Sequence, residues 1–228
     1  GSVNDEESYP VSFNQQKGVK WVHELSGPSA STPIVFNERV FLSATRLADG
    51  KGTEPALLAL CLDRESGKVL WAKSAGSGYM PGGKDGTVLQ LDSRSNYSSP
   101  SPVVSSKYVA FFYGNGDLLC FDHSGNLIWK RNIQKDYGDF CFQWTFSTSP
   151  TLFRDRLYLP VLQRDEQVHG RGRLNAESFI LCLDLENGET IWRHIRKSPA
   201  SKESRESFST IIPYRGNLLV AGGDILTS

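Results

Sequence analysis

Charged and titratable side chains gather in one glycine-containing stretch, "QRDEQVHGRGR" (163–173). Its members are Arg164, Asp165, Glu166, His169, Arg171 and Arg173. A guanidinium group presents several N–H donors in a planar fork that matches the two oxygens of a carboxylate or phosphate. The stretch therefore has two interpretations, a clamp for an anionic ligand or a solvated loop of mixed charge.

Aromatic residues stand at every second position of "FCFQWTF" (140–146). In an extended segment this spacing places Phe140, Phe142, Trp144 and Phe146 on one side. Such a side is typical of a core or blade-packing strand. The alternative is an aromatic platform for a sugar ring or a flat cofactor.

Three residue pairs stand at matched distances before repeated apolar segments, namely Asn96-Tyr97, Trp144-Thr145 and Arg205-Glu206. If these segments align as parallel repeats of one fold, the pairs ring the mouth of a central channel. The candidate ligand-binding residues are Asn96, Tyr97, Trp144, His169, Arg171, Arg205 and Glu206.

The sequence predicts neither a catalytic set nor a metal site. It has no CxxC or His/Cys ligand spacing, no adjacent cysteine pair, no G-x-S-x-G elbow and no P-loop. Cys61, Cys120 and Cys182 each stand two residues before an Asp, a repeated position that favours small buried side chains. No cofactor follows from the residues themselves.

Charge and hydropathy exclude further partners. The 228 residues include 25 basic and 25 acidic side chains, so nucleic acid is not an expected partner. No apolar stretch approaches the roughly 20 residues of a membrane-spanning helix. The opening Gly1-Ser2 is interpreted as a cloning scar within an N-terminal segment 1–17, and no signal peptide is present in this chain.

A repeat organises the rest of the chain. "LLALCLDRESGKVLW" (57–71), "DLLCFDHSGNLIW" (117–129) and "SFILCLDLENGETIW" (178–192) each contain an apolar segment, an Asp, a Gly-containing turn and a second segment that ends in Trp. This pattern predicts a β-hairpin. Each hairpin follows another, at 31–44, 100–113 and 148–161, and a further one stands at 209–222.

Two hairpins make four antiparallel strands, A to D, which is one blade of a β-propeller. We therefore expect an all-β fold, a partial ring of about four blades over residues 18–228. The predicted elements are a strand D at 18–25, blades at 31–73, 101–131 and 149–194, and strands A and B of a further blade at 209–224.

One tryptophan per blade is expected to dock the blades together. Trp21, Trp71, Trp129 and Trp192 recur at one position, where a large ring is buried and its N–H reaches a neighbouring backbone. The A–B and C–D turns are short, whereas the B–C and D–A loops on the opposite face are long. Long loops on a rigid scaffold are the expected place for binding.

Ala59-Leu60, Asp63, Gly67 and Trp71 resemble the "ALD…TGK..W" signature of pyrroloquinoline-quinone (PQQ) repeats. The chain thus resembles the PQQ-like, WD40/YVTN-like β-propellers of the quinoprotein alcohol dehydrogenase superfamily. Residues 162–173 and 203–210 also resemble bacterial secreted members. The resemblance implies about eight blades, an extracytoplasmic (periplasmic or secreted) location and, in true dehydrogenases, PQQ held by a vicinal disulfide, Ca²⁺ and an Asp base.

Three functions follow from this resemblance and the candidate residues. The first is a non-catalytic binding or scaffolding module with a protein, small-molecule or carbohydrate ligand on the long-loop face, similar to the propellers of outer-membrane protein assembly. The second is a fragment of a quinoprotein dehydrogenase, and the third a carbohydrate-binding propeller. The sequence favours a protein without enzymatic activity over an enzyme.

The chain is expected to be part of a larger propeller, because it supplies fifteen predicted strands and stops where a strand C should begin. Two alternatives leave no open edge. Two copies can join head to tail, so that strand D of one copy completes the last blade of the other. A four-bladed ring can also close on itself.

Overall fold

The computed structural model describes residues 12–14, 16–48, 52–78 and 96–228. Most of the predicted N-terminal segment 1–17 lies outside this part. The described chain is nearly all β, with a five-residue helix α1 (Ile133–Tyr137) and a 3₁₀ turn η1 (Lys202–Arg205). Among the described residues, neither helix has the length and apolar character that a membrane crossing requires.

Four antiparallel sheets follow one another along the described chain. The first contains β1 (Ile34–Phe36), β2 (Arg39–Arg46), β3 (Ala56–Asp63) and β4 (Val69–Ser77). The second contains β5 (Val103–Val104), β6 (Tyr108–Phe112), β7 (Asp117–Asp122) and β8 (Leu127–Asn132). The third contains β9 (Thr151–Phe153), β10 (Arg156–Val161), β11 (Phe179–Asp184) and β12 (Thr190–Ile195). The fourth contains β13 (Ile212–Tyr214), β14 (Asn217–Gly222) and β15 (Ile225–Thr227).

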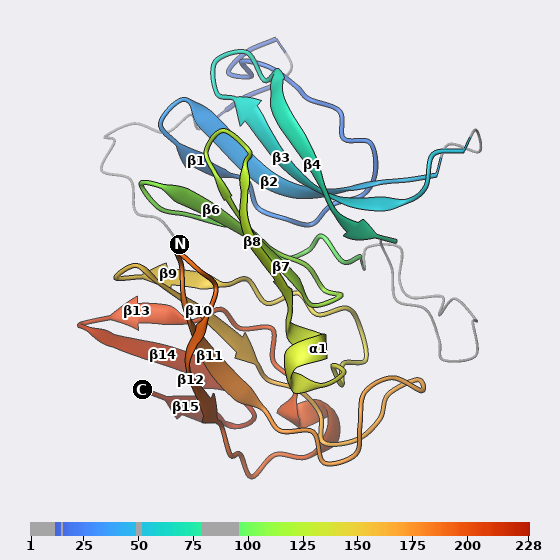
Figure 1. Cartoon of the computed structure of the whole chain (residues 1–228), viewed down its shortest axis with the longest axis vertical. Coiled ribbons are helices and arrows are strands. Elements are labelled where there is room, and N and C mark those ends of the chain that lie inside the picture. Colours follow the sequence, from blue (N-terminus) through green and yellow to red (C-terminus); the bar gives the residue numbers. More distant parts are fainter. Residues whose placement is uncertain (1–11, 15, 49–51, 79–95) are drawn as a thin grey trace.

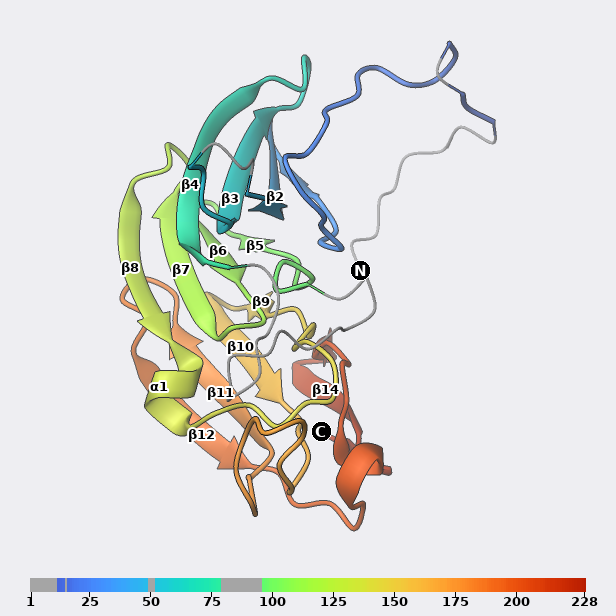
Figure 2. The same cartoon turned by 90° about the vertical axis from the view of Figure 1, so that its right-hand side faces the viewer.

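The sheets have the order of propeller blades, with each strand paired to the next along the chain. The all-β class and the partial ring of about four blades are confirmed. Figure 2 shows the sheets along an arc, with β4, β8 and β12 on its outer side. Figure 1 shows the β9–β10 and β13–β14 turns on the left and the loop 162–178 on the right, so short turns and long loops lie on opposite faces.

Two strand predictions need correction. The predicted strand D at 18–25 is not a strand, because no strand C lies beside it among the described residues to supply hydrogen bonds. At the other end, the predicted pair of strands at 209–224 gains a third strand, β15. The segment "ILT" (225–227) pairs with β14 in antiparallel register, with Gly222 opposite Ile225.

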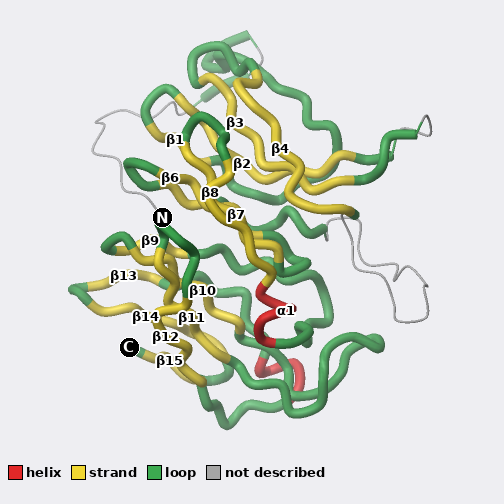
Figure 3. The backbone as a smooth tube through the Cα atoms, in the orientation of Figure 1, coloured by secondary structure: helices red, strands yellow, loops and turns green. Residues whose placement is uncertain are grey.

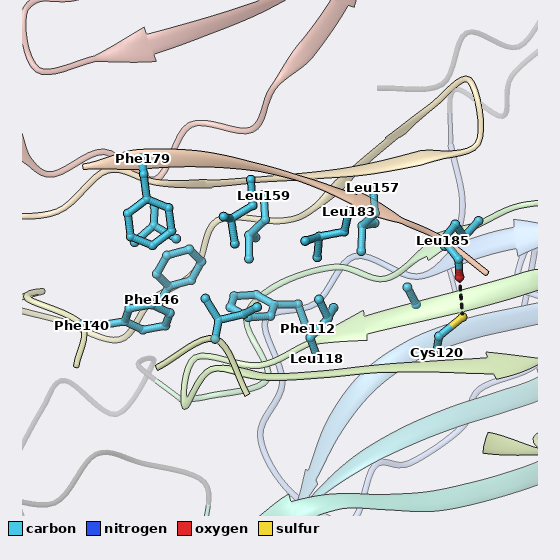
Figure 4. Packing of buried hydrophobic residues seen from close by; sticks show 14 of the residues in the cluster. Phe112, Leu118, Cys120, Phe140, Phe146, Leu157, Leu159, Phe179, Leu183 and Leu185 are labelled. Atoms are coloured by element: carbon cyan, nitrogen blue, oxygen red, sulfur yellow. Dashed lines mark hydrogen bonds between the residues drawn. The ribbon is translucent and has the colours of Figure 1, made fainter. Parts of the chain in front are cut away.

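The core lies between consecutive sheets. Strand C of each of the first three blades (β3, β7 and β11) is buried on both faces, which explains its continuous apolar run. Leu118 of β7 faces the third sheet, whereas its neighbour Leu119 faces the first. Figure 4 shows the interface of the second and third sheets, in which Phe112 and Leu118 meet Leu157 and Leu159.

Of the four predicted docking tryptophans, Trp21, Trp71 and Trp129 each dock onto a hairpin turn of the following blade. Trp192 is 40% exposed and donates to no turn in the described chain. Nε1 of Trp21 donates to the carbonyl oxygen of Arg64, that of Trp71 to His123, and that of Trp129 to Leu185, at 2.8, 3.1 and 2.8 Å. Each indole ring also lies on a turn glycine with positive φ, Gly67, Gly125 or Gly188. A Cβ at these glycines would approach the rings within 2.5 to 2.9 Å, so only glycine fits.

Serine hydroxyls connect neighbouring blades near the start of each strand A. Oγ of Ser101 accepts from the backbone N–H of Thr32, and Oγ of Ser149 accepts from that of Ser101, both at 2.9 Å. Each serine precedes a proline, in "SP" at 101–102 and at 149–150. These bonds hold the inner strands in register between blades.

Candidate functional site

The candidate site is a cavity of about 250 Å³ on the long-loop face, between the second and third blades. Its walls come from the loop 138–150, from the loop 162–178, and from Tyr97 and Gly114 beside them. Figure 3 shows these loops as irregular backbone outside the strands. Three sequence-predicted residues line it together, Tyr97, Trp144 and Arg171.

The aromatic segment 140–146 builds one wall. It is not a strand, because the chain bends at residues 143–144. Phe140, Phe142 and Phe146 turn inward, are 2–7% exposed and pack on one another with ring centroids 4.9 to 6.1 Å apart. Trp144 is 42% exposed. The aromatic residues at every second position therefore do not all point to one side. The three Phe rings join the core, whereas the Trp144 indole is partly exposed to solvent.

Arg171 supplies the positive charge of the cavity. Its Nη2 donates to the backbone carbonyl oxygens of Phe142 and Gln143, at 3.2 and 3.1 Å. Its Nε is buried without a hydrogen-bond partner in the described part of the chain. Burial lowers the pKa of Arg171, an effect that the charges of Tyr97 and Glu206 oppose. The guanidinium is thus held in place by backbone oxygens and retains donor capacity.

A buried ion pair holds the aromatic wall from behind. Oε1 of Glu206 accepts from Nε of Arg164 at 2.8 Å and from the backbone N–H of Gln143 at 2.6 Å. The Arg164 and Glu206 side chains are only 8% and 6% exposed. Nη2 of Arg164 also donates to Oε1 of Gln143. Three loops are therefore locked together at Gln143, directly before Trp144.

The other predicted residues lie around the cavity without lining it. Asn96 is 2% exposed and its Oδ1 accepts from the N–H and hydroxyl of Ser98. Arg205 forms an ion pair with Asp165 at 3.0 Å. His169 is exposed in the loop tip with a φ of 50°. Of the three matched pairs, Tyr97, Trp144 and Thr145 reach the cavity, whereas Arg205 and Glu206 support the loops beside it.

Sequence reasoning missed the polar part of the lining. Gln134 in α1 and Asp139 after it both line the cavity, and Oε1 of Gln134 accepts from the N–H of Phe140. Gly172 also lines it, and a Cβ there would lie 2.3 Å from Sγ of Cys141. The "GRG" spacing at 170–172 was the available signal, since φ is positive at both glycines.

The groups that the family resemblance assigns to PQQ and Ca²⁺ do not come together here. The four cysteines are separate buried thiols, so no vicinal disulfide can form. The described residues contain no group of three His, Cys, Asp or Glu side chains that could hold a metal ion. Asp139 is the one carboxylate among the cavity-lining residues of the described chain. The cavity does not fit this cofactor set.

A family model described as "Outer membrane protein assembly factor BamB" matches residues 11–168, more than half of the chain. The chain belongs to this family of PQQ-like β-propellers. The match covers the first two blades, the aromatic segment 140–146 and strands β9 and β10 of the third blade, and it ends within the loop 162–178, before Arg171. No curated protein matches the chain.

Solved structures with similar folds include three proteins. Quinohemoprotein alcohol dehydrogenase from Comamonas testosteroni is 17% identical (TM-score 0.49; 75% of this chain and 22% of that one). A europium-containing methanol dehydrogenase is 14% identical (TM-score 0.46; 77% and 26%), and BamB from Moraxella catarrhalis is 11% identical (TM-score 0.40; 91% and 71%). The chain spans about a fifth of the length of the alcohol dehydrogenase.

Proposed function

We propose that this propeller is a non-catalytic binding module whose ligand occupies the cavity lined by Tyr97, Trp144 and Arg171. The observation that carries the proposal is their convergence from three separate loops onto one cavity. Binding sites typically combine an apolar, aromatic wall with a few fixed polar groups, and this cavity has both. The Glu206–Arg164 pair supports the proposal because it holds the wall in one position before a ligand arrives.

We further propose an extracytoplasmic location, supported by the family description, which refers to outer-membrane protein assembly. Free thiols are uncommon in extracytoplasmic proteins, because cysteines form disulfides in oxidising compartments. Cys61, Cys120, Cys141 and Cys182 are all buried, however, which keeps them from oxidants. The four thiols are therefore compatible with an oxidising compartment.

Intrinsic fluorescence tests the binding function. Small probes (neutral and acidic monosaccharides, benzoate and a phenylalanine-containing tripeptide) are titrated into the wild type and into Trp144→Phe. We expect at least one probe class to change the emission of the wild type and not that of the variant. The proposal fails if no probe does so. If PQQ with Ca²⁺ then raises the melting temperature, the dehydrogenase-fragment alternative is favoured.

A further inference from the structure

The lining of the cavity divides into an apolar and a polar part. Trp144 and Tyr97 present aromatic surface, and three buried Phe side chains (Phe140, Phe142 and Phe146) also line the cavity. Asp139 and Thr145 supply hydrogen-bonding groups, and Arg171 supplies the cation. Gln134 also lines the cavity, but its Nε2 and Oε1 already bond to the backbone of Asn115 and Phe140. A ligand that fills this space therefore needs one apolar face, a hydroxylated rim and a group that accepts from a guanidinium.

The charge of Arg171 distinguishes this cavity from the rest of the molecule. Arg131, Arg156, Arg164, Arg193 and Arg205 each have a carboxylate within 3.0 Å. Arg171 has no carboxylate within ion-pair distance among the described residues, and Glu206, which acts on it electrostatically, already accepts from Arg164 and Gln143. A desolvated cation without a contacting anion gains from an anionic ligand.

Arg196 gives a useful contrast, because it is buried and, like the half-buried Arg171, has no carboxylate partner among the described residues. Its Nε, Nη1 and Nη2 donate to Thr227, Gly222 and Ile225, at 2.9, 2.7 and 2.7 Å. All three nitrogens of Arg196 are therefore used to hold the β14–β15 hairpin. On Arg171 only Nη2 has protein partners in the described chain. Arg171 thus has donors left for a ligand.

The size of the cavity restricts the ligand to one ring. Sites for drug-sized molecules enclose roughly 300–1,000 Å³. The cavity measures about 250 Å³, which suits a single six-membered ring with substituents. A flat aromatic acid would offer no hydroxyl to Asp139 or to Thr145, and Thr145 is only 5% exposed, so an unpaired group there costs binding free energy. A pyranose ring satisfies them through its hydroxyls.

We propose that the cavity binds a hexuronate, with the sugar ring on Trp144 and Tyr97, its carboxylate on Arg171 and its hydroxyls at Asp139 and Thr145. This inference rests on the proposed binding function and names the ligand class for that site. The ring is either a free monosaccharide or the end of an acidic polysaccharide, since both present the same group.

Isothermal titration with four probes tests the ligand class: D-glucuronate, its methyl ester, D-glucose and an oligoglucuronate. We expect glucuronate to bind at least tenfold more tightly than the ester or glucose, because the ester and glucose lack the charge that Arg171 recognises. Equal binding of glucose and glucuronate overturns the hexuronate while the binding function stands. No binding of any probe, in the titration or in the fluorescence experiment, overturns both.

Variants locate the interaction. We expect Arg171→Gln to weaken glucuronate binding roughly ten- to hundredfold, as for the loss of charge-assisted hydrogen bonds. Arg173→Gln is the matched control. Arg173 lies two residues after Arg171 and its side chain is exposed, so the variant loses the same charge but should bind glucuronate within twofold of the wild type. Equal losses in both variants would show unspecific attraction and contradict the proposal.

A further experiment distinguishes a sugar ligand from an acidic protein ligand. A hexapeptide of glutamates is titrated under the same conditions. If it binds with dependence on Arg171 while glucuronate does not, the cavity recognises an acidic peptide and the hexuronate proposal is wrong. Oligoglucuronate that binds more tightly than the monosaccharide would instead identify the end of a polysaccharide as the source of the ring.

Discussion

The two faces of this propeller are stabilised in different ways. On the short-turn face, one contact recurs: an indole lies on a turn glycine and donates to a turn carbonyl, three times along the described chain. On the long-loop face, Arg171, Gln143 and Glu206 form contacts that occur once. The difference separates two kinds of contact, because the repeated one holds the blades together and the single one shapes the cavity.

The largest effect is expected on the short-turn face. Gly188→Ala places a Cβ 2.6 Å from the Trp129 ring and forces alanine into a φ of 74°. We expect the free energy of unfolding in urea to fall by about 2–4 kcal/mol. Gly216→Ala is the control, since φ is 84° there but the nearest side-chain atom lies 3.6 Å away. Equal losses would mean that backbone strain, and not docking, is responsible.

The next effect concerns the long-loop face. Glu206→Gln removes the carboxylate that accepts from both Arg164 and Gln143, which we expect to cost about 1–3 kcal/mol in urea unfolding. Release of Gln143 should also make the Trp144 emission easier to quench with acrylamide. Glu203→Gln is the control, because its side chain is 75% exposed and lies 3.8 Å from Arg164. A loss of stability without a change in quenching would separate Glu206 from the cavity.

The thiols give a smaller effect, which depends on pH. Burial raises the pKa of Cys120 to about 12, and its Sγ donates to the same Leu185 carbonyl oxygen that Trp129 uses. An unfolded thiol loses its proton near pH 9, so above that pH the folded state binds more protons and stability falls as pH rises. We expect that, in Cys120→Ala, the free energy of unfolding falls less steeply above pH 9, by up to about 1.4 kcal/mol per pH unit.

Cys141 provides the comparison on the long-loop face. Burial also raises its pKa, but the backbone N–H of Arg173 donates to its Sγ and opposes the rise. Cys141→Ala should therefore remove less of the slope than Cys120→Ala, in urea titrations at pH 8, 9 and 10. The prediction fails if the two variants have the same slope.

The smallest effect separates two tryptophans of equal exposure. Trp144 is 42% exposed and Trp192 is 40% exposed, and Trp192 packs on Tyr158 with centroids 5.9 Å apart. We expect Trp144→Ala to change the unfolding free energy by less than about 1 kcal/mol, and by less than Trp192→Ala does. Calorimetric melting of both variants measures this difference. A larger loss in Trp144→Ala would make the indole part of the core.

Repetition explains which parts of the structure could be predicted from the sequence. Each of the first three blades supplies the same Asp-turn-Gly-Trp pattern, so strands such as β3 and β4 follow from one alignment. The strand predictions were wrong where a strand depends on a partner elsewhere in the chain. Residues 18–25 have the sequence pattern of a strand, but no strand lies beside them in the described chain. The segment "ILT" (225–227) was not predicted, yet it pairs with β14 and forms β15. Pairing, which a local pattern does not encode, decides both cases.

The cavity could be predicted only in part for a related reason. Trp144 and Arg171 stood out by residue type, and Tyr97 by its position before a repeated strand. Gln134 and Asp139 carry no such signal, because they reach the cavity through the course of a loop that no other blade shares. His169 is the opposite case. Its residue type suggested a ligand-binding role, but it lies exposed at a loop tip and does not line the cavity.

The direction of tryptophan docking has a consequence for synthesis on the ribosome. Each indole finds its acceptor carbonyl later in the chain, 43, 52 and 56 residues beyond Trp21, Trp71 and Trp129. A blade that has just emerged must therefore wait until the next hairpin is translated before its outer strand is anchored. In a stack where each unit contacts only its neighbours, the growing end always carries one undocked indole. The order of translation therefore sets the order of docking, in which each indole is anchored only after the following hairpin has formed.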